Sequence, residues 1–245
     1  MKLFVDVGNS RLKWAHCEKN ILSSIQAINY QSIDFTGILD EFWGDLVTPS
    51  NVYISNVGKQ SLNDLLITWC EEKWNISPIF AQTTQKNTGI TNGYTDPCVL
   101  GVDRWLALIG SIPYLSKNLC VVDCGTAVTV DILQINGLHL GGMILAGLQT
   151  SREALTQKTA ALQNIQFNQL FSGLSIAKNT QEGIALGTIY AIAGCIEKIA
   201  AAHQAKVILS GGDAPFIIPY LECEYLHAPD LIFQGLARWA DDNQL

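Results

Sequence analysis

Hydrophobic and polar positions follow two different periods along the chain. Short apolar runs followed by alternating residues predict β-strands, and they occur over residues 3–17 and 121–133. Apolar residues at helical spacing follow in each half. The expected helices are residues 61–74, 105–112, 151–162, 180–203 and 231–241, and the further strands are residues 76–81 and 206–209. Strands and helices mixed in this order predict an α/β fold.

A short motif occurs twice and indicates an internal duplication. Phe4 to Ser10 (FVDVGNS) has a counterpart at Val121 to Ala127 (VVDCGTA). Each copy reads as an apolar strand, an Asp-x-Gly turn, a second strand, another turn and a third strand. We therefore expect two similar halves, residues 1–114 and 115–245, with a cleft between them. The boundary falls near Pro113, where a proline interrupts a helical pattern.

Composition and charge narrow the class of protein. The chain has 245 residues, with 15 Lys and Arg against 22 Asp and Glu, so its formal net charge is −7. This balance argues against nucleic-acid binding, which needs clustered cations. Apolar residues make up 48%, enough for a large core. Charged residues make up 15%, below the usual ~25%, which favours burial of surface in a homo-oligomer.

Localisation and redox state follow from three further features. The first apolar run reaches Asp6 too early for a signal peptide, so we expect a cytoplasmic protein. The apolar stretch between Glu182 and Glu197 falls short of the ~20 residues that span a bilayer, which favours a buried helix and no membrane association. Seven cysteines without a CxxC spacing are interpreted as reduced core thiols, and a zinc site is disfavoured.

The first Asp-x-Gly turn is a candidate phosphate-binding loop. A carboxylate at the end of a buried strand, as at Asp6, is costly unless it is hydrogen-bonded, paired or metal-bound. The residues after it offer backbone space, an amide, a hydroxyl and an ammonium group, which suit a phosphate: Gly8, Asn9, Ser10 and Lys13. The alternative is a tight turn whose Asp and Asn cap local backbone amides.

The second turn favours the phosphate interpretation. Asp123, Gly125 and Thr126 place a carboxylate and a hydroxyl at the equivalent point of the second half, so two loops could hold the phosphates of a nucleotide with a cation. The sequence contains neither the GxxxxGK[ST] pattern of P-loops nor the GxGxxG pattern of dinucleotide-binding folds. Paired loops of this kind resemble those of the superfamily that contains sugar kinases, acetate kinases, actin and Hsp70 chaperones.

Further motifs make the resemblance specific. In order along the chain they are Asp6 to Lys13 (DVGNSRLK), Tyr94, Gly101 to Trp105 (GVDRW), Asp123 to Ala127 (DCGTA), Gly141 to Ile144 (GGMI) and Asn179 to Gly183 (NTQEG). The series resembles type III pantothenate kinases over residues 2–214. The resemblance implies a duplicated actin-like ATPase fold with the active site between two halves. It also implies ATP-dependent phosphorylation of pantothenate to 4′-phosphopantothenate, the first step of coenzyme A biosynthesis, by a homodimer.

The same resemblance implies roles for individual residues. Asp103 would be the general base, Asp123 a ligand of a monovalent cation (K⁺ or NH₄⁺), and Asp6 would lie near the Mg²⁺ that accompanies ATP. ATP would contact Asp6, Val7, Gly8, Asn9, Ser10, Lys13, Gly125 and Thr126. Pantothenate would contact Tyr94, Gly101, Val102, Arg104 and Thr180. Two departures from the family pattern affect loops: Ala146 in place of a proline, and Leu162-Gln163 without a following proline.

Some of these residues also have a plainer interpretation. Asp103 would fall in or just before the first turn of a helix, where the helix dipole favours a carboxylate without any catalytic role. Asn179 and Glu182 resemble a capping box around Thr180. Ser210 to Asp213 (SGGD) would as a lone motif be only a turn, although such a loop meets adenosine in the superfamily.

Three other functions stay open beside pantothenate kinase. They are another small-molecule kinase of the superfamily, a regulator resembling the Bvg accessory factor, and a structural actin-like ATPase. Asp6, Asp103 and Asp123 argue against an inactive enzyme, and 245 residues are few for an actin-like filament. A screen of acceptor molecules separates the kinases from one another.

Overall fold

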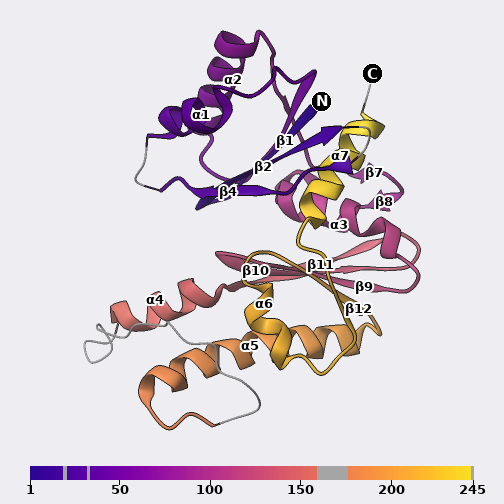
Figure 1. The fold of residues 1–245 in the computed structure, drawn as a ribbon. Coiled ribbons are helices and arrows are strands. Elements are labelled where there is room, and N and C mark those ends of the chain that lie inside the picture. The colour runs from indigo at the N-terminus through magenta and orange to yellow at the C-terminus, as the bar shows by residue number, and fades with distance from the viewer. Residues whose placement is uncertain (19–20, 32–33, 159–175, 244–245) are drawn as a thin grey trace. The chain divides into compact units, whose positions relative to one another are not determined.

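The computed structural model describes residues 1–18, 21–31, 34–158 and 176–243, which form two compact units (Figure 1). One unit comprises Met1–Ile112 and Asp230–Leu245, and the other comprises Pro113–Pro229. The boundary at 112/113 lies next to the expected one. Residues 230–245 differ from the expectation, because they belong with the first unit and not the second.

The first unit is built on a mixed sheet. Its strands are β1 (Lys2–Val7), β2 (Arg11–Glu18), β3 (Ile21–Leu22), β4 (Gln26–Asn29), β5 (Asn51–Asn56) and β6 (Ile79–Phe80). Their order is β3-β2-β1-β5-β6, and β4 also pairs with β2. β2 runs antiparallel to β1, whereas β5 and β6 run parallel to it. A separate two-stranded hairpin, β7 (Lys86–Asn87) and β8 (Ile90–Thr91), follows.

One face of this sheet carries the aromatic core of the first unit. Alternate residues of β1, such as Leu3 and Val5, pack with residues of α1 (Phe35–Trp43) and α2 (Ser61–Trp74), which lie together in Figure 1. Trp43 contacts three other tryptophan rings, among them Trp74 in a stacked arrangement with ring centroids 6.0 Å apart. The helix predicted over residues 61–74 is confirmed at both ends.

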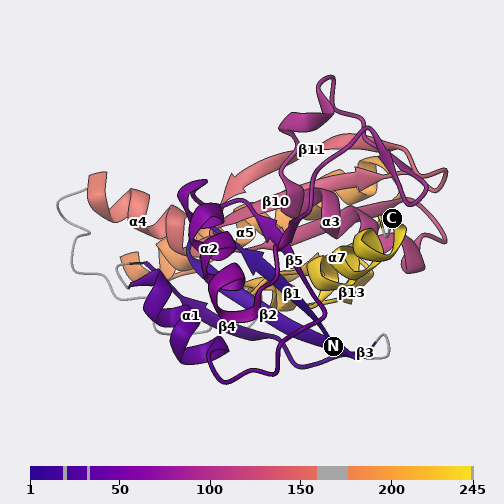
Figure 2. The same cartoon turned by 90° about the horizontal axis from the view of Figure 1, so that it is seen from above.

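The other face of the sheet is covered by two helices from distant parts of the chain. These are α3 (Val102–Ser111) and α7 (Leu231–Asp242), which lie side by side in Figure 2. The short 3-10 turns η1 (Pro97–Val99) and η2 (Ile112–Tyr114) flank α3. A Cβ on Gly235 would lie 1.8 Å from the carbonyl oxygen of Leu106, and one on Gly110 would lie 2.1 Å from that of Leu231. Two glycines thus allow the backbones to touch, and this contact draws the C-terminal helix into the first unit.

The second unit repeats the topology of the first. Its strands are β9 (Leu119–Cys124), β10 (Ala127–Leu133), β11 (His139–Ala146), β12 (Lys206–Ser210) and β13 (Tyr225–His227), in the order β11-β10-β9-β12-β13. β10 is antiparallel to β9, whereas β12 and β13 are parallel to it, as β5 and β6 are to β1. The duplication predicted from the two Asp-x-Gly motifs is therefore confirmed in the strand order.

Helices cover the second sheet on the side of Cys120, Val122 and Cys124. They are α4 (Leu148–Lys158), α5 (Thr180–Ala202), α6 (Ala214–Ile217) and the 3-10 turn η4 (Ile218–Tyr220). The helix expected over residues 151–162 begins earlier, and residues 159–162, with the Leu162-Gln163 departure, lie outside the described residues. Among the described helices, α5 has the length and apolarity of a membrane span, but 44% of that stretch is buried within the fold.

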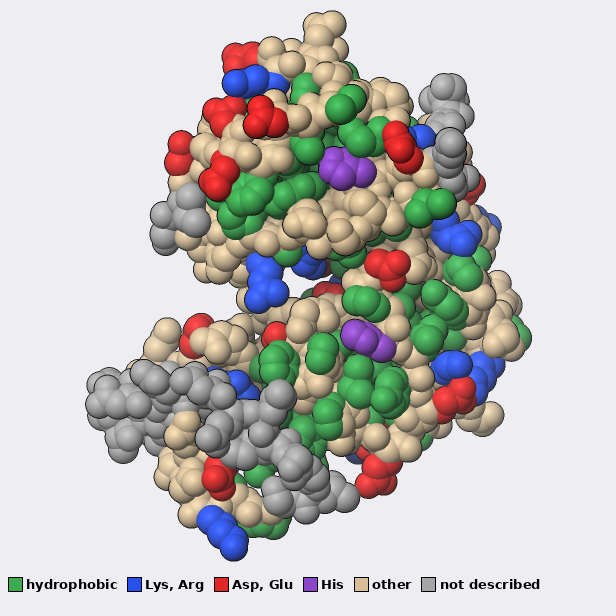
Figure 3. All heavy atoms as spheres, in the orientation of Figure 1, with side chains coloured by type: hydrophobic (Ala, Val, Ile, Leu, Met, Phe, Trp, Pro, Cys, Tyr) green, Lys and Arg blue, Asp and Glu red, His purple; other side chains and the backbone are tan. Residues whose placement is uncertain are grey.

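The distribution of charged side chains and the burial of most cysteines agree with the expectations from composition. On the face seen in Figure 3, Lys and Arg side chains are scattered among Asp and Glu side chains and not gathered into one patch. Four of the seven cysteines are buried, so the expectation that cysteines lie in the core holds for these. Burial raises the pKa of Cys70 and of Cys120 to about 12. Cys98 is exposed, which the sequence did not indicate.

Candidate active site

The first candidate phosphate loop is a tight connection between β1 and β2. Gly8 donates its N–H to the carbonyl oxygen of Arg11 at 3.0 Å, and the Tyr30 hydroxyl donates to the Gly8 carbonyl at 2.5 Å. Gln31 Nε2 donates to the Ser10 hydroxyl at 3.1 Å. The loop is thus held from the side of β4, which leaves Asn9 exposed at its tip. Val7 is fully buried in the core, so any contact of Val7 with a nucleotide would involve its backbone.

Asp6 lies at the end of β1 with its carboxylate almost completely buried. It is 3% exposed, and Lys13 on β2 faces it in register, with Nζ 3.4 Å from Asp6 Oδ2. Asp6 Oδ1 is buried and has no hydrogen-bond partner among the described residues. A buried carboxylate oxygen without a partner is costly, so it indicates a ligand from outside the chain. Carboxylate oxygens are hard donors that suit Mg²⁺.

Asp103 lies at the N-terminus of α3, as predicted. The helix begins at Val102, and Asp103 Oδ1 accepts a hydrogen bond from the backbone N–H of Arg104 at 2.7 Å. A Cβ on Gly101 would lie 2.6 Å from the same oxygen, so glycine at this position gives the carboxylate its space. The side chain is partly exposed. The helix N-terminus and a short hydrogen bond therefore fix a carboxylate that solvent and ligands can reach.

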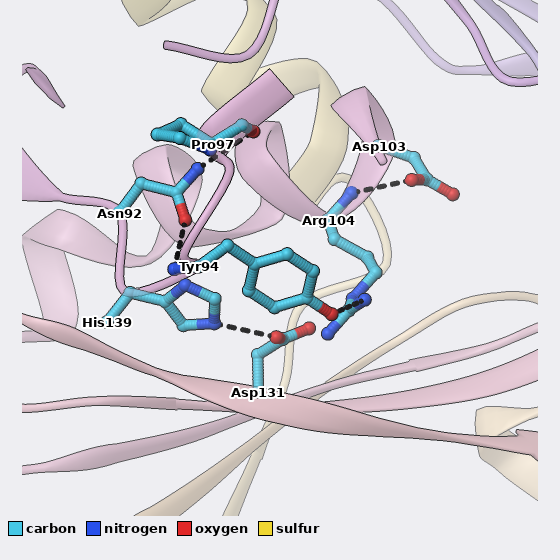
Figure 4. A network of polar contacts seen from close by, with 7 residues as sticks. All are labelled: Asn92, Tyr94, Pro97, Asp103, Arg104, Asp131 and His139. Carbon is cyan, nitrogen blue, oxygen red and sulfur yellow. Dashed lines mark hydrogen bonds and ion pairs between the residues drawn. The ribbon is translucent and has the colours of Figure 1, made fainter. Parts of the chain in front are cut away.

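Arg104 and Tyr94 form a contact beside Asp103 (Figure 4). Arg104 Nη1 donates to the Tyr94 hydroxyl at 2.7 Å, and the guanidinium carbon lies 5.4 Å from the centroid of the Tyr94 ring. Asn92, which is 2% exposed, accepts from the Tyr94 N–H at 3.0 Å and donates to the Pro97 carbonyl at 3.2 Å. The sequence did not single out Asn92. It holds the Tyr94 loop in shape, and it connects that loop to the turn before α3.

The second candidate phosphate loop joins β9 to β10 and is shorter than the first. Gly125 donates its N–H to the carbonyl oxygen of Ala127 at 3.0 Å, whereas the corresponding bond in the first loop spans one residue more. The Thr126 carbonyl accepts from the Gly147 N–H at 3.0 Å and from the Thr150 hydroxyl at 2.7 Å. The start of α4 therefore holds this loop, and the Thr126 side chain is exposed.

The segment after β12 packs against the same loop. Asp213 donates its N–H to the Cys124 carbonyl at 2.9 Å, and Ser210 pairs with Asp123 across the parallel strands. This contact places the predicted adenosine segment, residues 210–213, beside the second phosphate loop. Arg152 of α4 belongs to the same neighbourhood, because burial lowers the pKa of its guanidinium while the charge of Asp213 raises it. Arg152 is a candidate that the sequence analysis missed.

Thr180 begins α5, and the predicted cap is present. The Asn179 side chain accepts from the Glu182 N–H at 2.9 Å, and Glu182 Oε2 accepts from the Lys178 N–H at 3.2 Å. Thr180 is exposed and lines a groove of about 630 Å³ between β11, α4 and α5, together with apolar residues such as Leu145. The structure therefore supports the capping interpretation and leaves the Thr180 hydroxyl open to a ligand.

A buried His–Asp pair in the second unit was also missed. His139 Nε2 lies 2.8 Å from Asp131 Oδ1, and both side chains are at least 97% buried (Figure 4). Asp131 is on β10, on the face of the sheet that Asp123 shares. The signal in the sequence is a carboxylate inside an apolar strand, the same signal that identified Asp6. Among the described residues no group of three or more His, Cys, Asp or Glu side chains could hold a metal ion by itself.

Comparison with known proteins bears on the family and on the fold. A relative from Nitrosococcus oceani, described as a type III pantothenate kinase, is 34% identical over 99% of this chain and 94% of its own. The activator of 2-hydroxyisocaproyl-CoA dehydratase from Clostridium difficile, solved with bound ADPNP, has a similar fold, with a TM-score of 0.57 and 12% identity over 99% and 96% of the two chains.

A Campylobacter jejuni structure assigned to the Baf family of transcriptional activators has a TM-score of 0.62 and 21% identity, covering 98% of each chain. These likenesses show that the two mixed sheets form the actin-like ATPase fold. The sequence model of the type III pantothenate kinase family matches residues 2–202. The chain therefore belongs to the type III pantothenate kinase family, whose members phosphorylate pantothenate with ATP in coenzyme A biosynthesis.

Proposed function

We propose that Asp103 is the general base of pantothenate phosphorylation in this enzyme. The observation that carries the proposal is the position of its carboxylate, which is fixed at the N-terminus of α3 and is partly exposed beside the Tyr94–Arg104 pair. A general base must be rigid and within reach of the hydroxyl whose proton it takes. Of the carboxylates predicted to act, Asp103 is the one in the segment that the family resemblance assigns to pantothenate.

The reaction then has a simple balance. The hydroxyl oxygen of pantothenate attacks the γ-phosphorus of ATP, the bond from that phosphorus to the β,γ-bridging oxygen breaks, and ADP leaves. The hydroxyl proton passes to Asp103. Phosphoryl transfer has a loose transition state in most analyses, so a weak base at a helix N-terminus suffices to orient the nucleophile. Arg104, with its planar guanidinium held by Tyr94, suits the pantothenate carboxylate. Gly101, Val102 and Thr180 complete the proposed acceptor residues.

The residues proposed to bind ATP belong to the two candidate phosphate loops. Gly8, Asn9, Ser10 and Lys13 would bind phosphate in the first loop, with Asp6 and Val7 at its base. Gly125 and Thr126 would do so in the second. Asp6 would hold the Mg²⁺, as its partnerless Oδ1 supports, and Asp123 would bind the monovalent cation through hard oxygen. The cations supply charge neutralisation of the phosphates when bound.

Two further proposals concern the oligomeric state of the protein and its location in the cell. The exposed residues Gly187, Ala191 and Gly194 on α5 leave room for a close helix contact, and Met143 and Ile144 on β11 are large exposed apolar side chains. These features support a homodimer. A cytoplasmic location fits the metabolic function of the family.

The experiment measures phosphate transfer from MgATP to pantothenate, with and without K⁺, by the parent and by Asp103→Asn. Asparagine keeps the acceptor for the Arg104 N–H but cannot take a proton, so kcat should fall about 10²–10⁴-fold with ATP affinity kept. The matched control is Asp96→Asn, which changes another helix-starting carboxylate, the acceptor for the Cys98 N–H at 3.0 Å, outside the proposed site. Turnover of folded Asp103→Asn at the parent rate would refute the assignment.

A second variant, Asp123→Ala, tests the cation. It should weaken ATP affinity and abolish the response to K⁺. A K⁺ titration that matches the parent would refute the role of Asp123. Silence of a folded, ATP-binding parent with pantothenate would favour another acceptor or the regulatory alternative.

A further inference from the structure

A second buried oxygen without a partner lies next to Asp6. Ser55, on β5, is 0% exposed, and its hydroxyl has no hydrogen-bond partner among the described residues. Asp6 Oδ1 shares this condition. Neither the motif analysis nor the family resemblance pointed to Ser55.

The strand register places the two oxygens side by side. Asp6 and Ser55 are direct partners across the parallel pair β1 and β5, and Lys13 is the partner of Asp6 on the opposite side. In-register side chains on neighbouring strands point to the same face, and the strands lie about 4.8 Å apart. The row therefore runs Lys13, Asp6, Ser55. Ala81, which follows β6 beyond Ser55, has no side chain that could bond to the serine.

The same arrangement recurs in the second unit. Ser210 is the register partner of Asp123 on the parallel pair β12 and β9, and it is 2% exposed. Each unit therefore pairs the carboxylate near the end of its first strand with a buried serine near the end of the parallel strand beside it. A chance polar residue in the core would have no reason to recur at the equivalent position of the repeat.

The energetics argue that Ser55 has a partner in the working enzyme. A buried hydroxyl without a hydrogen bond costs stability, whereas an alanine of nearly the same shape would cost nothing there. The Lys13 ammonium is on the far side of Asp6 and bonds Oδ2, so it leaves Oδ1 and the serine to another group. A group that satisfies both oxygens must be polar and must reach the end of β1.

We propose that Ser55 is a positioning residue of the nucleotide site, whose hydroxyl binds, together with Asp6 Oδ1, the water shell of the Mg²⁺ that accompanies ATP. The inference rests on the magnesium role proposed for Asp6. Mg²⁺ keeps several of its water molecules when protein binds it, so a carboxylate and a neighbouring hydroxyl are suitable partners for its hydration shell. Ser55 would act on the ion through water and touch neither pantothenate nor Asp103.

The test is isothermal titration calorimetry of ATP without pantothenate, in Mg²⁺ and in EDTA. Mg²⁺ should raise ATP affinity in the parent, and Ser55→Ala should reduce this enhancement about tenfold, the effect of one hydrogen bond. In EDTA, the affinity of Ser55→Ala for ATP should equal that of the parent. The ligand-free variant should unfold at or above the parent temperature, because no hydrogen bond is lost. Ser55→Cys, which has a poor donor of similar size, should show the same loss and serves if the alanine variant does not fold.

Two control variants separate the outcomes. Ser111→Ala removes an equally buried hydroxyl that already donates to the Leu108 carbonyl at 2.7 Å, so it should lower the unfolding temperature and keep the full Mg²⁺ enhancement. Asp6→Asn should lose the enhancement. If Asp6→Asn loses it and Ser55→Ala keeps it, the role of Ser55 is overturned and that of Asp6 stands. If Asp6→Asn also keeps it, the magnesium role proposed for Asp6 falls, and the inference falls with it.

Discussion

The crossing of α3 and α7 offers a direct test of how packing positions the acceptor residues. Gly235→Ala would place a Cβ 1.8 Å from the carbonyl oxygen of Leu106, where ordinary contact begins near 3.4 Å. The obstacle is backbone, so no side chain can rotate away. The two helices must therefore separate. A Cβ on Gly110 would likewise lie 2.1 Å from the Leu231 carbonyl oxygen, so the backbones are in close contact at both glycines.

The expected loss of stability is the difference between two opposing effects. Alanine favours a helix over glycine by about 1 kcal/mol, whereas forced separation of a packed contact costs about 1–3 kcal/mol. A clash between two backbones belongs at the upper end, so we expect a net loss of about 2 kcal/mol. In a chain of this size that corresponds to a fall in unfolding temperature of about 4–8 °C.

The displacement should also reach the chemistry. The first turn of α3 carries Asp103 and Arg104, and a misplacement of about 1 Å can cost about a hundredfold in rate. We therefore expect kcat/KM of Gly235→Ala to fall at least about tenfold at 20 °C, well below its unfolding transition.

Circular dichroism during heating and a steady-state transfer assay measure the two effects. The control is Gly183→Ala near the start of α5, where a Cβ would meet only the Ala177 side chain among the described residues, at an ordinary 3.9 Å, so its unfolding temperature should equal or exceed that of the parent. If Gly235→Ala melts no lower than the parent and keeps its activity, then the close crossing does not hold α3 in place.

Two more predictions concern buried and exposed charge in the second unit. His139→Phe deprives the buried Asp131 of its 2.8 Å partner and should lower the free energy of unfolding by about 3–5 kcal/mol in urea titrations; a loss below about 1 kcal/mol would contradict the pairing. Hydrogen bonds from Lys117 and Lys206, at 2.8 and 2.9 Å, lower the pKa of Glu224 to about 2. Glu224→Gln should therefore have a lower unfolding temperature than the parent at neutral pH. The difference between the two unfolding temperatures should disappear as pH falls from about 4.5 towards 2, because the parent carboxylate then also becomes neutral. A difference that does not change with pH would refute the role of the carboxylate charge.

The sequence predicts most of the fold because its periodic segments agree with their packing. The helix over residues 61–74 and the strand from Lys206 were found correctly, since apolar spacing alone defines them. The assignment of α7 to the second half was wrong for a physical reason. Two glycines, Gly110 and Gly235, decide its partner, and nothing in the order of elements reveals that these residues meet.

The candidate site was predictable where a residue breaks a local rule. Asp6 and Asp123 stand out as charges at the ends of apolar strands, and Asp103 stands out through the helix that starts beside it. Asn92 and Arg152 carry no such signal, because polar residues in loops and on helices are ordinary. Their part in the site depends on contacts that only the fold creates.

Ser55 differs from both groups. The sequence shows a serine near the end of an apolar strand, but it does not show that this serine lies beside Asp6. A serine near the end of a buried strand has a neutral, small side chain that a core tolerates, so it attracts no attention beside an aspartate. The repeat changes this judgement, because Asp6 pairs with Ser55 and Asp123 pairs with Ser210 in the same register. An internal duplication thus allows one half of the chain to be compared with the other. The Asp–Ser pair is present in both halves, although the turns beside it differ in length. We therefore attribute the pair to a requirement that the two sites share and not to the packing of either sheet.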